Sequence, residues 1–365
     1  MSNRANTYAL NPLLVLLVCL AGCAGNANPS PVVPTGMSSL RERGATSTAT
    51  YTLTDLGTLP GCNGSEVGFA RFSGRGEISS TGLAVGSSDC GATVATRFNK
   101  GQTKNLNTIG ANVSFAASIN DSGQITGTET MTSNGTPHAF LYNNGKMRPL
   151  DDSLFQGGTE AIQINKSGKI VGAGFITDTS LHAFLYRRGK MVDLHPFNAF
   201  QSTAASINDS GEIIGSAATS SRMIDTWLYA KGKFTVISQT NSGVFIANNG
   251  EIVGVNSANH AALYSNGTWT DLGTLPGGST SIAEGINANG QVVGIACCVG
   301  HSRTHESVGV IFANGGAVDL NTLVSPNNGF TIRNAIAINN AGQIVGNAIT
   351  TDSFKIGHAV LLTPQ

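Results

Sequence analysis

Residue types suited to metal chemistry gather in the segment CCVGHSRTHE, at positions 297–306. Thiols, imidazoles and carboxylates are the groups that bind zinc in proteins, and this segment holds all three. They belong to Cys297, Cys298, His301, His305 and Glu306. The spacing matches no common zinc motif, so a zinc site, a loop that contacts another ligand and an ordinary solvated loop all stay open. We predict no resident metal and no organic cofactor.

Four other histidines each begin a similar short segment elsewhere in the chain. They are His138, His182, His260 and His358. We expect them to lie too far apart to share a metal, and each to have a structural role through a hydrogen bond to the backbone. The turn INDSG at 119–123 could suggest calcium, but similar turns hold Lys166, Ala288 and Asn340 instead of further carboxylates. Calcium is therefore disfavoured.

Two cysteines outside these segments are candidates for a disulfide. Cys62 and Cys90 fall in loops that we expect on the same face of the protein, and an exported chain permits disulfides. Their pairing is one interpretation, and free thiols are the other. Cys297 and Cys298 could form a vicinal disulfide or remain thiols.

These residues are set in a sequence that repeats about every 43 residues. INDSGQITGTE at 119 returns as INKSGKIVGAG at 164, INDSGEIIGSA at 207, INANGQVVGIA at 286 and INNAGQIVGNA at 338. A second landmark, an aromatic residue followed by a glycine turn as in AFLYNNGK, occurs six times. An earlier copy is degraded, and its turn could contain either Gly76 or Gly82. Such a period indicates a repeat architecture.

Each repeat reads as four short strands, which is the composition of one blade of a β-propeller. The last repeat stops in its third strand, at HAVLLTPQ, whereas YTLTDLGTLPG at 51 resembles the fourth strand in GTWTDLGTLPGG at 267. The fold class predicted is all-β: a seven-bladed β-propeller of four-stranded blades, closed by the N-terminal strand completing the last blade. A solenoid is the alternative fold, and six or eight blades fit the count less well.

The repeated residue types are interpreted as structural, because a catalytic group is needed only once. The turn glycine should take a positive φ. The isoleucine before each asparagine, as in Ile164, should fill the space between blades. The second glycine, as in Gly172, lies inside a strand and should let neighbouring blades pack closely.

The N-terminus reads as an export signal. Residues 1–22 contain Arg4 and the apolar run LLVLLVCLAG, which is short for a membrane span. The run ends at LAGC, which resembles the bacterial lipobox, and this resemblance implies lipidation of Cys23. Residues 23–49 are rich in Pro, Ser, Gly and Asn and are predicted to be a flexible tether, with the propeller at 50–365. Ala24 after the cysteine favours the outer membrane or cell surface over the inner membrane.

The repeats carry a family resemblance. INxxGxIVGxA, DLGTLPGG and the triplet His138-Ala139-Phe140, repeated at residues 182–184, are similar to the probable extracellular repeats of the HAF family. The likeness covers about residues 51 to 363. It implies an exported bacterial repeat protein, a propeller in fold, and it carries over no catalytic residue because the triplet is altered in several copies.

Loop lengths give the functional expectation. Two loop types should be short and two long and variable, which places sequence diversity on one face, where binding residues concentrate. Around a mouth on that face we expect charged residues at first-strand starts and in adjoining loops, and histidines in the 297–306 loop. They are Glu160, Glu284, Arg333, Asp151, Asp152, Arg222, Asp225, His301 and His305.

The function predicted is a lipid-anchored extracytoplasmic binding or interaction module for a glycan or an envelope protein. A polysaccharide hydrolase or lyase and a purely structural or adhesive envelope protein are the alternatives. The formal net charge of zero, with 12% charged residues, argues against nucleic acid as a partner.

Overall fold

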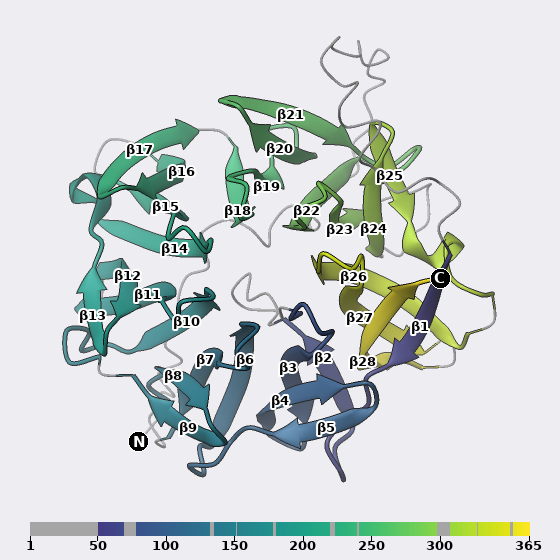
Figure 1. The fold of residues 1–365 in the computed structure, drawn as a ribbon, viewed down its shortest axis with the longest axis horizontal. Helices are drawn as coiled ribbons and strands as arrows, with labels where there is room; N and C mark the ends of the chain where they lie inside the picture. Colours follow the sequence, from purple (N-terminus) through teal and green to yellow (C-terminus); the bar gives the residue numbers. More distant parts are fainter. Residues whose placement is uncertain are drawn as a thin grey trace, which may run out of the picture.

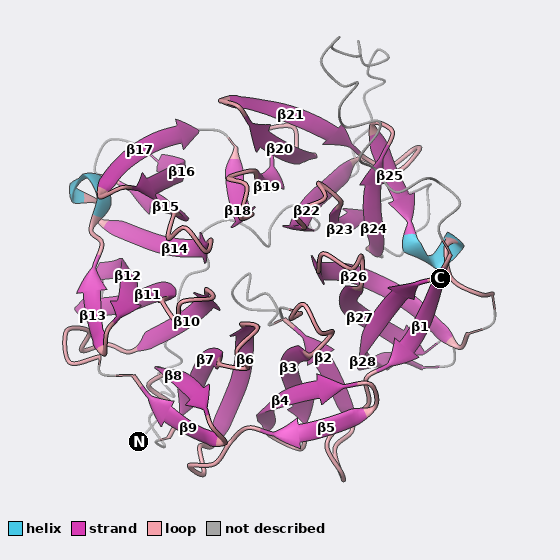
Figure 2. Cartoon of the chain, in the orientation of Figure 1, coloured by secondary structure: helices cyan, strands magenta, loops and turns pink. Residues whose placement is uncertain are grey.

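The protein is a ring of seven four-stranded antiparallel sheets, and Figures 1 and 2 show this ring of strands with two short 3-10 helices as the only helical elements among the described residues. The computed structural model describes residues 50–68, 78–131, 135–150, 152–177, 180–219, 223–238, 241–297, 307–326, 328–350 and 353–365. In each sheet the strands follow one another from the centre of the ring outwards. The predicted seven-bladed β-propeller is confirmed.

The blades are numbered here in chain order. Blade 1 contains β2 (Gly64–Val67), β3 (Ala84–Asp89), β4 (Thr93–Asn99) and β5 (Gln102–Asn105). Blade 2 contains β6 (Val113–Ile119), β7 (Ile125–Thr130), β8 (His138–Asn143) and β9 (Lys146–Pro149). Blade 3 contains β10 (Thr159–Ile164), β11 (Ile170–Thr177), β12 (Ser180–Arg187) and β13 (Lys190–Asp193).

Blade 4 follows the 3-10 helix η1 (Pro196–Asn198) and contains β14 (Gln201–Ile207), β15 (Ile213–Ala218), β16 (Met223–Ala230) and β17 (Lys233–Ser238). Blade 5 contains β18 (Ser242–Ile246), β19 (Ile252–Val255), β20 (Ala261–Ser265) and β21 (Thr268–Gly273). Blade 6 contains β22 (Thr280–Ile286), β23 (Val292–Cys297), β24 (Val308–Ala313) and β25 (Gly316–Asp319). Blade 7 follows η2 (Leu320–Thr322) and contains β26 (Phe330–Ile338), β27 (Ile344–Thr350), β28 (Ser353–Pro364) and β1 (Tyr51–Asp55).

The two ends of the described chain close the ring within blade 7. Strand β1 pairs antiparallel with β28, from Tyr51 opposite Pro364 to Asp55 opposite Val360. The Leu56 amide continues this pairing with a hydrogen bond to the carbonyl of Ala359, at 2.9 Å. The N-terminal segment therefore supplies the outer strand that the last repeat lacks, as predicted. Closure pairs the outer edge of β28 with β1 and joins the two ends of the described chain in one sheet.

The register of the first repeat, which the sequence left open, is settled by its turn. The Gly82 amide donates to the carbonyl of Ser79 at 3.0 Å, and the Ser79 amide donates to the carbonyl of Leu83 at 2.8 Å. The same two bonds form the turn at Asn120 and Gly123. Gly82 is thus the turn glycine of blade 1, and Ser79 stands where later repeats have asparagine.

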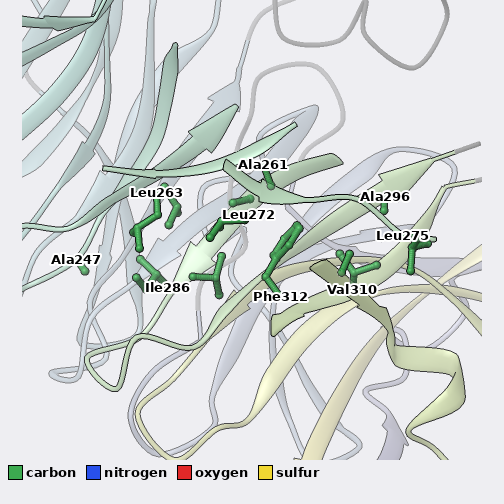
Figure 3. Close-up of a cluster of buried hydrophobic side chains, with 13 residues drawn as sticks. Ala247, Ala261, Leu263, Leu272, Leu275, Ile286, Ala296, Val310 and Phe312 are labelled. Atoms are coloured by element: carbon green, nitrogen blue, oxygen red, sulfur yellow. The ribbon is translucent and has the colours of Figure 1, made fainter. Parts of the chain in front are cut away.

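The core lies between neighbouring blades. Ile164 of blade 3 packs in a buried cluster with Ala139 and Leu150 from blade 2, as predicted for the repeated isoleucine. Between blades 5 and 6, Leu263 of β20 and Ile286 of β22 belong to one such cluster. Figure 3 shows its aliphatic side chains together with Phe312 of β24. Replacing one of these buried isoleucines by alanine would leave a cavity that costs about 2 to 5 kcal/mol.

The glycine inside each second strand serves a contact within its own blade, so the prediction that it helps neighbouring blades pack was wrong. A Cβ at Gly172 would lie 2.0 Å from the Glu160 carbonyl oxygen and 2.9 Å from the Phe184 ring, both in blade 3. The first strand bulges next to this point, between Ala161 and Gln163. The bulge brings the carbonyl against the second strand, and only glycine leaves room for it.

Candidate functional site

The two faces of the ring differ in the regularity of their loops. On one, which we call the turn face, first and second strands are joined by five residues in six blades, and all six hairpins between third and fourth strands have two-residue turns. The connection in blade 1 is longer, and part of it lies outside the described residues. On the opposite face, the long-loop face, connections range from two to ten residues. The predicted division into a regular and a variable face is therefore present.

The turn face is held together by the repeated asparagine. The Asn165 side-chain oxygen accepts from the amides of Ser167 and Lys169, which shapes its own turn. Its side-chain nitrogen donates to the carbonyl of Asn208 in the next blade, at 3.0 Å. We call the equivalent residues the turn belt. They are Ser79, Asn120, Asn165, Asn208, Ala247, Asn287 and Asn339.

All five asparagines of the belt donate to the next blade, so links are made from blades 2, 3, 4, 6 and 7. Ser79 and Ala247 lack the amide and cannot donate in this way. The bond from each asparagine to the neighbouring blade was not predicted from the sequence. The signal for it was the asparagine itself, since Asp or Ser would serve the turn equally well but cannot donate two hydrogen bonds.

The long-loop face carries four histidine–aspartate pairs instead of the predicted histidine–backbone bonds. His Nδ1 lies 2.8 to 3.0 Å from an aspartate oxygen in each. The pairs are His138–Asp152, His182–Asp193, His260–Asp271 and His358–Asp55. They lie in blades 2, 3, 5 and 7, so no two of these histidines share a ligand position. The expectation that they act separately was correct. The expected partner was wrong because an aspartate of the outer strand, or in blade 2 of the loop after it, lies beside each histidine.

In three of these aspartates, the oxygen that does not contact the histidine accepts a hydrogen bond from the backbone amide two residues later, in the turn after the outer strand. Asp193 Oδ1 accepts from the amide of His195 at 3.0 Å. Asp55 and Asp271 accept in the same way from the amides of Gly57 and Gly273. In blade 2 the carboxylate comes from the loop after β9, where Asp152 also accepts from the Thr159 hydroxyl. Each pair thus joins the third strand to the start of a long loop.

Blade 3 extends its pair with a third side chain. His182, Asp193 and His195 each offer a ligand atom within 4.8 Å of the others, and this is the sole such triad among the described residues. The rings of His182 and His195 lie 4.5 Å apart between centroids. His195 was missed in the sequence analysis. The signal was DLH at 193–195, where two other repeats read DLG, at 55–57 and 271–273.

The large apolar side chains that are exposed also lie on the long-loop face. Met131, Leu154 and Phe200 are 42%, 46% and 58% exposed, and they are the only large hydrophobic residues in that state within the described part of the chain. They occupy the β7–β8, β9–β10 and β13–β14 loops. We call these three residues the apolar sector, which spans blades 2 to 4 beside the histidine triad. The sequence analysis considered charged residues and did not predict a role for these three apolar residues.

The charged residues predicted around the mouth are spread over several blades. Glu160 lies at the start of β10, whereas Glu284 lies in the second half of β22, further from the long-loop face than expected. Arg333 sits at a bulge in β26 and donates to the carbonyl of Ser307 at 3.4 Å. Strand β10 lies across the ring from β22 and β26 (Figure 1). The three residues therefore do not form one cluster, and a role in binding stays a prediction.

The remaining predicted site residues divide into two groups. Asp225 belongs to strand β16 and not to a loop as expected, and Asp152 is engaged by His138. Four others fall outside the described residues, as do Cys298 and Glu306 of the CCVGHSRTHE segment. They are Asp151, Arg222, His301 and His305. The lipidation residue Cys23 and the whole of residues 1–49 also lie outside that part of the chain.

Cys62 and Cys90 are joined by a disulfide on the long-loop face, with Cα atoms 4.1 Å apart. It links the loop between β1 and β2 to the hairpin between β3 and β4. The bond ties the closing strand of blade 7 to blade 1. Cys297 is buried at the end of β23.

Two carboxyl groups near the long-loop face, one buried and one partly buried, have a raised pKa. Glu129, at the end of β7, is 1% exposed, and neither of its oxygens has a hydrogen-bond partner. Burial raises the pKa of Glu129, an effect that His138 opposes and Asp152 reinforces. Burial likewise raises the pKa of Glu66 on the inner strand β2, although the Ser87 hydroxyl lowers it in part. Neither residue was singled out from the sequence.

Comparison with known proteins supports the fold alone. No protein-family model matches this chain, and neither does any curated protein sequence. Among solved structures it is similar to an acylaminoacyl peptidase from Pyrococcus horikoshii, at 10% identity and a TM-score of 0.52, over 84% of this chain and 53% of that one. It also matches TolB from Acinetobacter baumannii, at 11% identity and a TM-score of 0.41, over 87% of this chain and 63% of TolB.

YCF48 bound to D1 peptide is a third match, at 10% identity and a TM-score of 0.49, over 87% of this chain and 96% of YCF48. This chain thus spans only about half to two thirds of the length of the peptidase and of TolB. At such identities the matches assign no activity, and the seven four-stranded sheets themselves define the class of protein as a β-propeller.

Proposed function

We propose that this protein is a lipid-anchored extracytoplasmic β-propeller that binds a glycan or another envelope protein through its long-loop face. The observation that carries the proposal is the position of the exposed apolar side chains. Met131, Leu154 and Phe200 all lie on the face whose loops vary, in three loops of blades 2 to 4. Exposed aliphatic and aromatic groups supply binding energy when a partner covers them.

The turn face offers no comparable surface among the described residues. Its hairpins expose polar residues such as Lys146, Lys190 and Lys233, and its asparagines are occupied by bonds between blades. A fold that fixes one face by repetition leaves the other free to acquire binding residues. The long-loop face is therefore the better candidate for recognition.

The anchor belongs to the proposal on the strength of the sequence. The motif LAGC favours acylation of Cys23, residues 23–49 would form the tether, and the outer membrane or cell surface is the location we propose. No helix in the described part of the chain has the length and apolar character needed to cross a membrane. Membership of the HAF family is part of the same proposal. Mass spectrometry of the mature N-terminus tests the lipidation of Cys23. The parent chain should carry acyl groups there, and the Cys23→Ser chain should carry none.

The binding claim is tested with residues 50–365, which contain the complete closed ring. The immobilised domain is exposed to a glycan panel and to solubilised envelope proteins, and retention is measured. The Met131→Ser/Leu154→Ser/Phe200→Ser variant should lose binding with little change in melting temperature. The matched control, Lys146→Ser/Lys190→Ser/Lys233→Ser, changes three exposed turn-face residues and should bind normally.

Three outcomes would contradict the proposal. Equal binding by both triple variants would remove the long-loop face as the site. Release of products from a polysaccharide would favour the hydrolase or lyase alternative, in which paired carboxyl groups act on the substrate. Absence of any retained component would favour a structural role in the envelope.

A further inference from the structure

The histidine–aspartate pairs of blades 3, 5 and 7 are followed by the same kind of turn. Blade 3 differs from the other two at one position of this turn. After the aspartate and a leucine, blades 7 and 5 have Gly57 and Gly273, with φ of 76° and 78°. Blade 3 has His195 at the equivalent position, also with a positive φ, of 22°. Non-glycine residues seldom adopt this region, because their Cβ meets the backbone. An imidazole therefore stands where the repeat favours glycine.

The substitution places a third metal-binding group beside an existing pair. His182 Nδ1 and Asp193 Oδ2 are 2.8 Å apart, and a ligand atom of His195 lies within 4.8 Å of both side chains. Two imidazoles and one carboxylate suit Zn²⁺ and related divalent transition metals. Ligand atoms around tetrahedral zinc lie about 3.4 Å apart, given metal–ligand bonds of about 2.1 Å. A rotation of the exposed His195 side chain would close the remaining distance.

The other nitrogen of His182 is already held in the orientation that a metal ligand requires. Its Nε2 lies 2.9 Å from the Ser180 hydroxyl, and Ser180 is fixed in turn by a 3.4 Å hydrogen bond to the carbonyl of Phe200. The 2.8 Å hydrogen bond from Nδ1 to Asp193 needs a proton on Nδ1, and when Nε2–H donates to the Ser180 hydroxyl oxygen, a metal ion can take the place of that Nδ1 proton. Metal-ligating histidines usually donate their second N–H to such a partner, which fixes the tautomer and the ring.

The geometry points to a divalent transition-metal site formed by His182, Asp193 and His195 on the long-loop face of blade 3. The three side chains leave at least one coordination position for water or for an oxygen donor of a partner. The site adjoins Phe200 of the apolar sector, but it does not depend on the proposed glycan or protein binding. The pairs in blades 5 and 7 lack the third ligand, so they are internal controls.

Calorimetry on the full chain, prepared without a polyhistidine tag and freed of metal by a chelator, tests the site with Zn²⁺ alone. We expect saturable binding at one site. His195→Gly should weaken binding by about tenfold or more. This variant restores the residue found in blades 5 and 7, so it should melt at least as high as the parent. His260→Ala breaks a pair without a third ligand and should bind Zn²⁺ as the parent does.

Substitution with Co²⁺ gives a second readout, because visible absorption bands report its coordination. These bands should be present in the parent chain and lost in His195→Gly. Two results would overturn the assignment. One is an absence of Zn²⁺ binding, and the other is binding that survives His195→Gly but disappears in His301→Ala/His305→Ala, which would move the metal to the CCVGHSRTHE segment.

Discussion

The turn face and the long-loop face are built from the same repeats, yet they use polar residues in opposite ways. On the turn face, Asn165 and its equivalents bond both to their own turn and to the next blade. On the long-loop face, pairs such as His182–Asp193 stay within one blade, and Glu129 is buried without a hydrogen bond to either oxygen. The turn face is fixed by one asparagine bond that recurs between blades, whereas the loops of the long-loop face differ from blade to blade, even where a contact such as the Cys62–Cys90 disulfide joins two blades.

This difference explains where the sequence can vary. A five-residue turn in the belt must keep its length, because its asparagine has to reach a carbonyl of the next blade. A long loop has no such obligation, so its length ranges from two to ten residues and it can carry residues as different as His195 and Phe200. Structural repetition and functional variation are thereby separated on one scaffold.

The largest predicted effect comes from inserting Gly-Ser between Lys166 and Ser167, in a belt turn. The insertion would disrupt the hydrogen bonds of Asn165 within the turn and to Asn208, and we expect a loss of about 3 kcal/mol in the free energy of unfolding. The same insertion between Ser325 and Pro326, in a long loop, should cost about 0.6 kcal/mol or less. Denaturant unfolding followed by circular dichroism measures both. Equal losses would abolish the distinction between the faces.

Asn165→Ala should have the next largest effect, about 2 kcal/mol of destabilisation. It leaves the amides of Ser167 and Lys169 and the carbonyl of Asn208 without this partner. Thermal unfolding by calorimetry gives the value. A matched change on the other face, His260→Ala, breaks a partly exposed pair and should cost less than about 1 kcal/mol. The reverse ranking would show that the belt contributes little.

Ala247→Asn should stabilise the protein by about 1 kcal/mol, because it would supply the belt link to blade 6 that blade 5 lacks. The backbone at Ala247 already forms the belt turn, since its amide donates to the carbonyl of Glu251 and its carbonyl accepts from Gly250. Urea unfolding of this variant and of Ala247→Ser, which cannot bridge the blades, isolates the contribution of the side-chain amide. Identical midpoints for the two variants would count against the link.

The smallest predicted change is in the pH dependence of stability. Burial holds the pKa of Glu129 above its ordinary value of 4.5, so the folded protein retains this proton at pH values where the unfolded chain has lost it. Its contribution to stability is complete below about pH 4.5 and is lost as pH rises through the raised pKa. Glu129→Gln should therefore gain stability relative to the parent as pH rises above 4.5. Unfolding midpoints from pH 4 to 8 test this, and a constant difference would contradict it.

The sequence predicted the ring and its closure because both depend on patterns that repeat. TDLGTLPG occurs at 54–61 and again at 270–277, and this duplication located β1 in blade 7. Contacts that depend on three dimensions were not predictable. The position of Gly172 against the Glu160 carbonyl follows from a bulge, and the bond from Asn165 to Asn208 follows from the spacing of blades.

The candidate site was predicted less well than the fold. Charged residues were sought at strand starts, but Glu160, Glu284 and Arg333 lie on three separate blades. His195 and Phe200 were passed over because each breaks the repeat at only one position. A search for departures from DLG and for apolar residues within variable loops would have found both.

Hydrogen exchange of the backbone amides tests the account most directly, since it reports both faces in one measurement. The turn amides after β6, β10, β14, β22 and β26, whose asparagines bond to the next blade, should exchange at a common slow rate set by global unfolding. Amides of the long loops should exchange faster and at rates that differ from blade to blade. Unrelated rates among these five turns, or turns as fast as the long loops, would contradict a belt that fixes one face and leaves the other free to vary.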